Sequence, residues 1–303
     1  MKILVTGGAG YLGSVLVPEF LRQGHEVHVL DTFHGSGARL LDCVESKRFQ
    51  VTKGDCRDTQ VLRSVVGWSD LIVPLAGLVG APACDKDQDF AKSVNLDAVR
   101  LLLSMRTTQP IFFPATDSGY GAGPGGGVIC TEESPISPQS LYGKTKADAE
   151  KAVLDSGNCI SFRLASLFGA SPRMRFDLLL HDFTRTAYRD RKMFVFEGAA
   201  VRNFVHVRDV ASAFLIGLER FHEMRDRPFN VALTKESMPK REICRLISEF
   251  LPDFECVESP IGSDPDRRDY IVSNQKLVAL GWQPKFSIRD GIKEILKVCQ
   301  MYV

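Results

Sequence analysis

The chain begins with a short apolar run that leads directly into three glycines spaced three residues apart, Gly7, Gly10 and Gly13. Each glycine in such a turn has a physical task. The first permits a tight turn, the second lets the backbone approach a ligand, and the third lets a helix pack closely on a sheet. This spacing therefore predicts a strand at residues 3–5, a turn, and a helix at residues 15–23.

Apolar runs and helical periodicity alternate through the first half of the chain. Further buried strands are predicted at residues 26–30, 49–53, 71–75, 111–114 and 158–164. Helices are predicted between them at residues 60–66, 89–107 and 140–155. This alternation favours a parallel sheet with helices on both faces. We predict an α/β fold with a Rossmann-type doubly wound parallel sheet.

The pattern changes after Gly169, where segments rich in arginine and aromatic residues replace the strand and helix rhythm. We expect a cofactor-binding domain at residues 1–168 and a smaller C-terminal α/β substrate lobe at residues 169–303. A predicted strand at 201–207 and helix at 209–220 suggest that residues 203–222 return to the first domain. Amphipathic helices are predicted at residues 240–251 and 288–301.

Charge and cysteine content exclude several classes of protein. The 38 Lys and Arg residues against 37 Asp and Glu leave a net charge of +1, without the basic excess of a nucleic-acid groove. The eight cysteines are scattered singly and suit a reduced, cytoplasmic protein with no metal site. No apolar run approaches the ~20 residues that span a bilayer, and the N-terminal run is too short for a signal peptide. We expect no nucleic-acid or membrane partner.

The glycine turn has a carboxylate in the place that a dinucleotide site requires. Asp31 ends the second predicted strand, where it can accept hydrogen bonds from an adenosine ribose and repel a 2′-phosphate. The pattern favours NAD over NADP. The alternative is that the glycines only form a turn and Asp31 only caps a loop.

Further cofactor contacts are predicted from position alone. Ligands of open parallel sheets gather at the carboxyl ends of the strands and at the first helix N-terminus. The candidates there are Tyr11, Leu12, Thr32, Asp55, Cys56, Leu75, Ala76 and Gly77. Ordinary loop residues are the alternative for each.

A second constellation suits alcohol oxidation. Tyr142 and Lys146 are four residues apart on a predicted helix, so a cation can lower the pKa of the phenol. A phenolate so stabilised can take a proton from a hydroxyl while hydride leaves the same carbon. Thr116, just beyond a predicted strand, could hold the substrate oxygen beside them. A solvated helical pair is the alternative for Tyr142 and Lys146.

The chain resembles the extended short-chain dehydrogenase/reductase family of NAD-dependent nucleotide-sugar epimerases and dehydratases, nearly end to end. The matching stretches are residues 6–13, 55–58, 115–121, 142–146, 163–169, 202–210 and 276–282. The resemblance implies that Tyr142 is the acid/base, that Lys146 is its electrostatic partner and a cofactor ligand, and that Thr116 polarises the substrate. It also implies a homodimer built on a four-helix bundle.

One departure from the family pattern bears on the reaction. Dehydratases of the family place an Asp-Glu pair directly after the threonine, and this chain has Asp117 and Ser118. Without the glutamate there is no evident base for a proton at C5. Dehydration is therefore disfavoured, although Asp117 could still contact a sugar hydroxyl, and both residues are predicted to bind substrate.

A narrower likeness lies in residues 74–82, 131–135, 171–180 and 264–270, which are similar to the GDP-heptose 4-dehydrogenases of capsule-heptose biosynthesis. That group usually has Asn at the position of Asp117. Guanidinium groups suit the diphosphate of such a substrate, and five arginines of the second lobe are candidates for it, with surface ion pairs as the alternative. They are Arg173, Arg175, Arg202, Arg267 and Arg268.

These residues lead to one hypothesis with two alternatives. The chain is predicted to oxidise C4 of a nucleotide-diphosphate sugar, a GDP-heptose or GDP-hexose, to a 4-keto sugar, with Tyr142 as base and NAD as oxidant. The first alternative is a 4-epimerase with a transient 4-keto intermediate. The second is a binding protein that senses NAD and has lost its chemistry.

Overall fold

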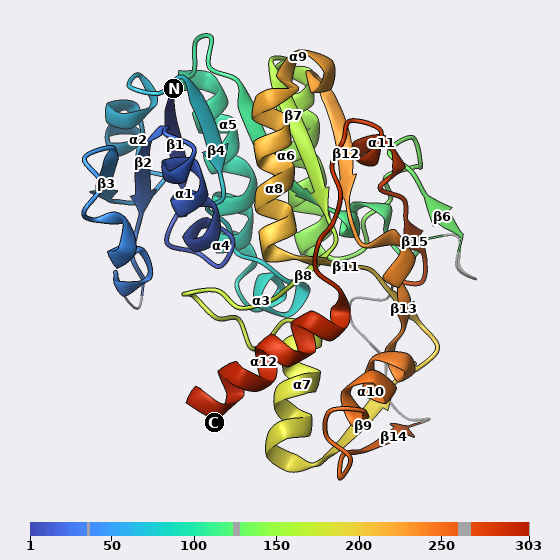
Figure 1. Cartoon of the computed structure of the whole chain (residues 1–303). Helices are drawn as coiled ribbons and strands as arrows, with labels where there is room; N and C mark the ends of the chain where they lie inside the picture. The colour runs from blue at the N-terminus through green and yellow to red at the C-terminus, as the bar shows by residue number, and fades with distance from the viewer. Residues whose placement is uncertain (35–36, 124–127, 260–267, 303) are drawn as a thin grey trace.

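A computed structural model describes residues 1–34, 37–123, 128–259 and 268–302. Its centre is a seven-stranded sheet in the order β12-β7-β5-β4-β1-β2-β3, in which every pair of neighbours is parallel (Figure 1). The strands are β1 (Lys2–Thr6), β2 (Glu26–Asp31), β3 (Phe49–Lys53), β4 (Leu71–Pro74), β5 (Ile111–Thr116), β7 (Cys159–Leu164) and β12 (Arg227–Val231). The predicted α/β fold with a doubly wound parallel sheet is confirmed.

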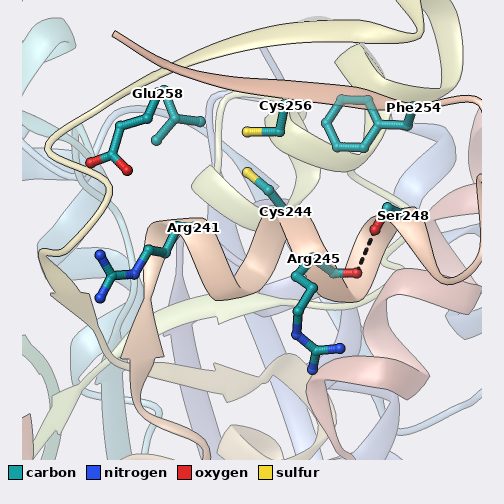
Figure 2. A pocket seen from close by; sticks show the side chains of 8 residues that line it. Arg241, Cys244, Arg245, Ser248, Phe254, Cys256 and Glu258 are labelled. Atoms are coloured by element: carbon teal, nitrogen blue, oxygen red, sulfur yellow. Dashed lines mark hydrogen bonds between the residues drawn. The ribbon is translucent and has the colours of Figure 1, made fainter. Parts of the chain in front are cut away.

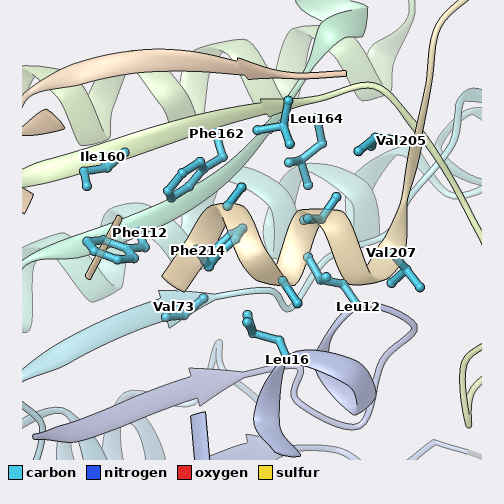
Figure 3. Close-up of a cluster of buried hydrophobic side chains, with 14 of the residues drawn as sticks. Leu12, Leu16, Val73, Phe112, Ile160, Phe162, Leu164, Val205, Val207 and Phe214 are labelled. Carbon is cyan, nitrogen blue, oxygen red and sulfur yellow. The ribbon is translucent and has the colours of Figure 1, made fainter. Parts of the chain in front are cut away.

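Helices cover both faces of this sheet because side chains alternate along each buried strand. On β1, Ile3 and Val5 join one core cluster with α1 (Gly13–Arg22) and α8 (Val207–Glu219). Leu4 joins the opposite cluster with α2 (Thr59–Val66), α5 (Ala98–Met105) and α6 (Leu141–Asp155). Figure 3 shows the first cluster, in which Phe162 stacks on Phe214 of α8 with ring centroids 4.4 Å apart.

The helix predicted at residues 89–107 is divided into three parts. It consists of α4 (Gln88–Lys92), a π-helical turn (Ser93–Asp97) and α5. The wider turn carries Asn95, whose side chain bonds to the backbone of Leu78. The π-helical turn therefore accompanies a polar contact between Asn95 and Leu78, which hydrophobic periodicity could not predict.

The strand predicted at residues 201–207 is also divided. It forms β10 (Val201–Arg202), which pairs with β13 (Met238–Pro239), and β11 (Phe204–His206), which pairs with β8 (Ser166–Phe168). Between them Asn203 is buried and bonds through its side chain to Tyr270, Val272 and Ser237. The chain then returns to the large sheet through α8 and α9 (Phe221–Met224), and β12 becomes an edge strand that the sequence did not predict.

The remaining C-terminal elements form a smaller α/β unit around their own core. It contains α7 (Leu179–Asp190), β9 (Lys192–Phe196), α10 (Lys240–Ser248), β14 (Glu255–Ser259) and α12 (Ile288–Tyr302). Shorter elements complete the fold: α3 (Ala81–Lys86), β6 (Ile129–Cys130), β15 (Ile271–Val272), α11 (Gln275–Val278), and 3-10 turns at Ala38–Cys43, Asp117–Tyr120 and Thr234–Glu236. Within the described residues, no helix is both long and apolar enough to cross a membrane.

A cavity of about 290 Å³ lies in this unit, between α10 and β14 (Figure 2). Cys244 and Cys256 point toward each other within it, beside Arg241 and Arg245. All eight cysteines of the chain are free thiols. None of the predicted site residues that the structure describes lines this cavity.

Candidate active site

The glycine turn between β1 and α1 has no room for a side chain at its first or its last glycine. Gly7 has φ +72°, and a Cβ there would lie 2.5 Å from the backbone nitrogen of Ala76. A Cβ on Gly13 would lie 2.5 Å from the carbonyl oxygen of Gly8. Helix α1 begins at Gly13, directly after the turn, and a helix N-terminus in this place is what a dinucleotide pyrophosphate requires. The turn therefore fits NAD.

Asp31 is held rigidly at the end of β2. Its carboxylate accepts hydrogen bonds from the backbone nitrogens of Ala9 (2.9 Å) and Phe33 (2.7 Å). The contact with Ala9 ties the carboxylate to the glycine turn. Asp31 and the adjacent Thr32 both line a cavity of about 230 Å³ at the carboxyl edge of the sheet.

Most of the predicted cofactor residues line this cavity, which we call the cofactor cavity. Besides Asp31 and Thr32, the predicted residues in its wall are Gly7, Gly10, Asp55, Cys56, Leu75, Ala76 and Gly77. Tyr11, Leu12 and Gly13 are buried at the start of α1. The wall also contains residues that the sequence did not suggest as cofactor ligands: Ala9, Leu30, His34, Arg39, Gly54, Arg57, Phe90, Val94 and Arg173.

Asp55 and Cys56 differ in charge state. A side-chain hydrogen bond from Arg57 lowers the pKa of Asp55, and the two groups form an ion pair of 2.6 Å. Burial raises the pKa of the Cys56 thiol to about 11. The guanidinium of Arg57 also lies 4.7 Å from the ring centroid of Phe90. This corner of the cavity therefore offers a neutral thiol and an aromatic face.

Asn95 fixes the segment after β4 along the cofactor cavity. Its Oδ1 accepts from the backbone nitrogen of Leu78 (2.8 Å), and its Nδ2 donates to the Leu78 carbonyl (2.9 Å) and to Thr145 Oγ1 on α6 (3.4 Å). A Cβ on Gly77 would lie 2.9 Å from Asn95 Oδ1. This positioning residue has no short-range signal in the sequence.

The three predicted catalytic residues converge at the end of β5. Ser140 caps α6 by accepting from the backbone nitrogen of Gly143 (3.1 Å), which starts the helix one residue before Tyr142. Tyr142 lies close enough to Thr116 for the threonine hydroxyl to lower the pKa of the tyrosine. The Lys146 ammonium lies 4.2 Å from the ring centroid of Phe113 on β5.

Burial sets the charge state of the catalytic pair without cofactor. It raises the pKa of Tyr142 to about 12, against the opposing effects of the Thr116 hydrogen bond and the Arg175 charge. It lowers the pKa of Lys146 to about 8, against the opposing attraction of Glu150. At neutral pH Tyr142 is therefore a neutral phenol, and Lys146 is protonated in most molecules.

A buried ion pair lies behind Lys146. Arg163 Nε is 2.9 Å from Glu150 Oε1, with both side chains 6% exposed, and Ser161 Oγ donates to the same carboxylate oxygen (2.6 Å). Arg163 also donates to Tyr120 Oη (3.1 Å) and to the carbonyl of Glu132 (3.0 Å). This network is one helical turn beyond Lys146, and sequence reasoning missed it.

The predicted substrate residues fall into two groups. In the first, Arg268 Nη1 lies 2.7 Å from the Oδ1 atom of the buried Asp117, and Arg202 donates to the Arg268 carbonyl (2.6 Å). Ser118 accepts from Thr116 Oγ1 (3.2 Å), so it lies beside the catalytic hydroxyl. Arg267 lies outside the described residues.

The second group is the loop after β8. Arg175 forms an ion pair with Asp177 and lies close enough to Tyr142 for its charge to lower the tyrosine pKa. Arg173 instead lines the cofactor cavity. The structure therefore does not bring Arg173 together with Arg202 and Arg268.

Comparisons with known proteins agree with this geometry. Residues 3–232 match the model of the NAD dependent epimerase/dehydratase family. The chain is 28% identical to a UDP-glucose 4-epimerase of Corynebacterium glutamicum, over 94% of this chain and 91% of that protein. It is 26% identical to a CDP-paratose 2-epimerase of Salmonella typhi, over 97% and 98%.

Among solved structures, the fold is similar to a UDP-glucuronic acid 4-epimerase from Bacillus cereus in complex with UDP-glucuronic acid and NAD. The TM-score is 0.87 at 21% identity, and all of both chains is covered.

Proposed function

Because the chain belongs to the NAD dependent epimerase/dehydratase family, whose members use NAD on nucleotide sugars, we propose that it oxidises C4 of a nucleotide-diphosphate sugar. The observation that carries the proposal is the convergence of Tyr142, Thr116 and Lys146 at the end of β5, beside a cavity that fits NAD. The end of β5 lies at the same edge of the parallel sheet as this cavity, which supports an acid/base that acts close to a hydride acceptor.

Each catalytic side chain has a separate task. Thr116 and Tyr142 lie close together, so a substrate hydroxyl that contacts both can be oriented by one and deprotonated by the other. Tyr142 acts as base in its phenolate form, after release of its own proton to solvent, and the charge on Lys146 favours that form. The phenolate takes the proton of the substrate hydroxyl as hydride leaves C4. NAD, when bound, supplies the hydride acceptor. The product is a 4-keto sugar and reduced cofactor.

The nucleotide and the fate of the keto sugar define two candidates. The likeness of residues 74–82 and 264–270 to GDP-heptose 4-dehydrogenases supports release of the 4-keto sugar from a GDP-heptose or GDP-hexose. The UDP-glucose 4-epimerase of C. glutamicum, similar over 94% of the chain, supports a UDP-sugar 4-epimerase with a transient 4-keto intermediate. Ser118, whose hydroxyl bonds to Thr116, argues against 4,6-dehydration in either case.

One assay separates these candidates. Purified protein is incubated with GDP- and UDP-sugars, and the absorbance of reduced cofactor is followed while the sugars are analysed by chromatography. A dehydrogenase accumulates reduced cofactor with a keto sugar, whereas an epimerase converts the sugar with no net reduction. Inertness toward every nucleotide sugar would remove both candidates.

The Tyr142→Phe variant tests the mechanism. It removes one hydroxyl and retains the ring, and we expect turnover to fall by about 100-fold or more because general acid–base catalysis contributes roughly that much. NAD binding is the control and should persist. Unchanged turnover would refute the role of Tyr142 and revive the NAD-sensing alternative.

The proposal also covers the oligomeric state, the cellular location and the domain division of the protein. We propose a homodimer through a four-helix bundle, to be tested by analytical ultracentrifugation. We propose a cytoplasmic location, to be tested by cell fractionation. We also propose that residues 1–168 and 169–303 form separate cofactor and substrate domains, with residues 203–222 in the first, to be tested by limited proteolysis.

A further inference from the structure

Arg173 lies on the cofactor side of the molecule although its loop belongs to the C-terminal half. The loop follows β8, and Arg173 lines the same cavity as Gly7, Gly10 and Asp31. Its Nη1 donates to the backbone carbonyl of Met174 (3.3 Å). The guanidinium therefore lies beside the glycine turn, although the two segments are about 160 residues apart in the sequence.

Positive charge is concentrated at this wall of the cavity. Burial lowers the pKa of Arg173, and the charges of Arg39 and Arg175 lower it further, against the smaller opposing effects of Asp177 and Asp31. Arg39 also lines the cavity and donates to the carbonyls of Ala9 (3.4 Å) and His34 (3.2 Å). Of the ion pairs found within residues 1–34, 37–123, 128–259 and 268–302, none includes Arg39 or Arg173. Arginine charges held close together repel each other, and a bound anion would reduce this repulsion.

We propose that Arg173 is a cofactor-binding residue that pairs with the pyrophosphate of NAD. The pyrophosphate carries the negative charge of the dinucleotide, and a guanidinium fork matches its oxygens. The glycine turn supplies N–H groups from one side, and Arg173 supplies charge from the other. The assignment replaces the sequence-based expectation that Arg173 binds the diphosphate of the sugar nucleotide.

Ser171 positions Arg173 on the glycine turn. Ser171 Oγ donates to the carbonyl of Tyr11 (2.8 Å), lies 2.9 Å from Ser14 Oγ, and accepts from the backbone nitrogen of Arg173 (3.3 Å). Tyr11 Oη donates to the carbonyl of Gly169 (2.7 Å). The loop is thus attached to residues between and just after the glycines, where the cofactor binds.

His181 holds the same loop from behind. Its Nε2 accepts from the backbone nitrogen of Gly169 (3.0 Å), so in the neutral ring Nδ1 carries the proton and donates to the carbonyl of Arg175 (2.8 Å). Burial lowers the pKa of His181 to about 4, so the ring stays neutral at physiological pH. Both ends of the segment that contains Arg173 are therefore fixed.

Titrations of NAD-free protein test the proposal. NAD, ADP, adenosine, UDP and GDP are titrated by calorimetry into wild type and into the Arg173→Gln, Arg173→Lys and Ser171→Ala variants. We expect Arg173→Gln to weaken NAD and ADP binding by about 10- to 100-fold, because hydrogen bonds to charged groups have that effect. Adenosine, which lacks phosphate, should bind within about twofold of wild type. Arg173→Lys should retain part of the affinity, and Ser171→Ala should weaken NAD by about fivefold.

Arg189→Gln is the matched control, since Arg189 is an exposed arginine of the same lobe that pairs with Asp190 on α7. Its NAD affinity should equal that of wild type. A misfolded Arg173→Gln sample would lose adenosine as well, and Arg173→Lys and Ser171→Ala would then carry the test.

Two results would overturn the assignment. One is wild-type NAD affinity in both Arg173→Gln and Ser171→Ala. The other is a loss confined to UDP or GDP, which would place Arg173 in the sugar-nucleotide site. Failure to turn over any nucleotide sugar would remove the proposed function and leave these cofactor titrations unaffected.

Discussion

Replacing Glu150 by glutamine isolates the contribution of one buried charge to stability. The amide keeps the shape of the side chain and an oxygen that can still accept from Ser161 and Arg163. It removes the negative charge that lies 2.9 Å from Arg163 Nε. The substitution therefore leaves the packing of α6 on β7 intact while a guanidinium that is 6% exposed loses its counter-charge.

The expected loss of stability in Glu150→Gln follows from the distance between the two charges and from their burial. At 2.9 Å and an effective dielectric constant near 20, the attraction between the two charges is about 6 kcal/mol. Desolvation of both groups offsets much of that in the wild type, but loss of one partner leaves the other buried and unpaired, which costs about 3–5 kcal/mol. Because the amide retains hydrogen bonds, we expect the lower end, about 3 kcal/mol.

Urea unfolding at 25 °C measures the difference. The control is Lys151→Gln in the same helix, which removes an ion pair of 2.7 Å whose side chains are 75% and 64% exposed. It should change the free energy of unfolding by no more than about 0.5 kcal/mol. A loss below about 1 kcal/mol for Glu150→Gln, or losses of equal size in the two variants, would refute the argument that burial makes this pair strong.

The same substitution and one glycine give the remaining predictions. The charge of Glu150 raises the pKa of Lys146, which burial has lowered to about 8, so Lys146 loses its proton as pH rises through that value. In Glu150→Gln the pKa falls further, and the alkaline decline of kcat/KM should move to lower pH, whereas an unmoved profile would contradict the coupling. Gly7→Ala should abolish NAD binding, since its Cβ would lie 2.5 Å from the Ala76 nitrogen at a φ of +72°; calorimetry that still detects binding would show that the turn can yield.

The sequence predicts those features that depend on neighbours in the chain. The glycine turn, Asp31 at the end of β2, and Tyr142 and Lys146 on one helical face all follow from local spacing, and the structure places them at one edge of the sheet. Alternating apolar runs were sufficient for six of the seven strands in the sheet. The seventh, β12, has the sequence Arg-Pro-Phe-Asn-Val, so no apolar run marks it as a buried strand.

The features that the sequence missed are polar contacts between distant segments. Glu150 accepts a hydrogen bond from Arg163, 13 residues away in the sequence, and Asn95 accepts one from Leu78, 17 residues away. Neither pair has a period or motif, because each depends on how α6 and the π-helical turn pack on the sheet. Arg173 shows the same limit: its residue type predicted an anion, but only the packing of its loop on Tyr11 indicates which anion lies within reach.

The segment after β5 joins the two lobes through alternate side chains. Thr116 and Ser118 bond to each other beside Tyr142, whereas the carboxylate of Asp117 between them pairs with Arg268, 151 residues away. A carboxylate paired in this way is a poor general base, because the adjacent guanidinium favours its ionised form. Asp117 therefore attaches the segment before β15 to the end of β5, as Ser171 attaches a loop of the C-terminal half to the glycine turn. Both halves of the site therefore depend on contacts between segments that are far apart in the sequence.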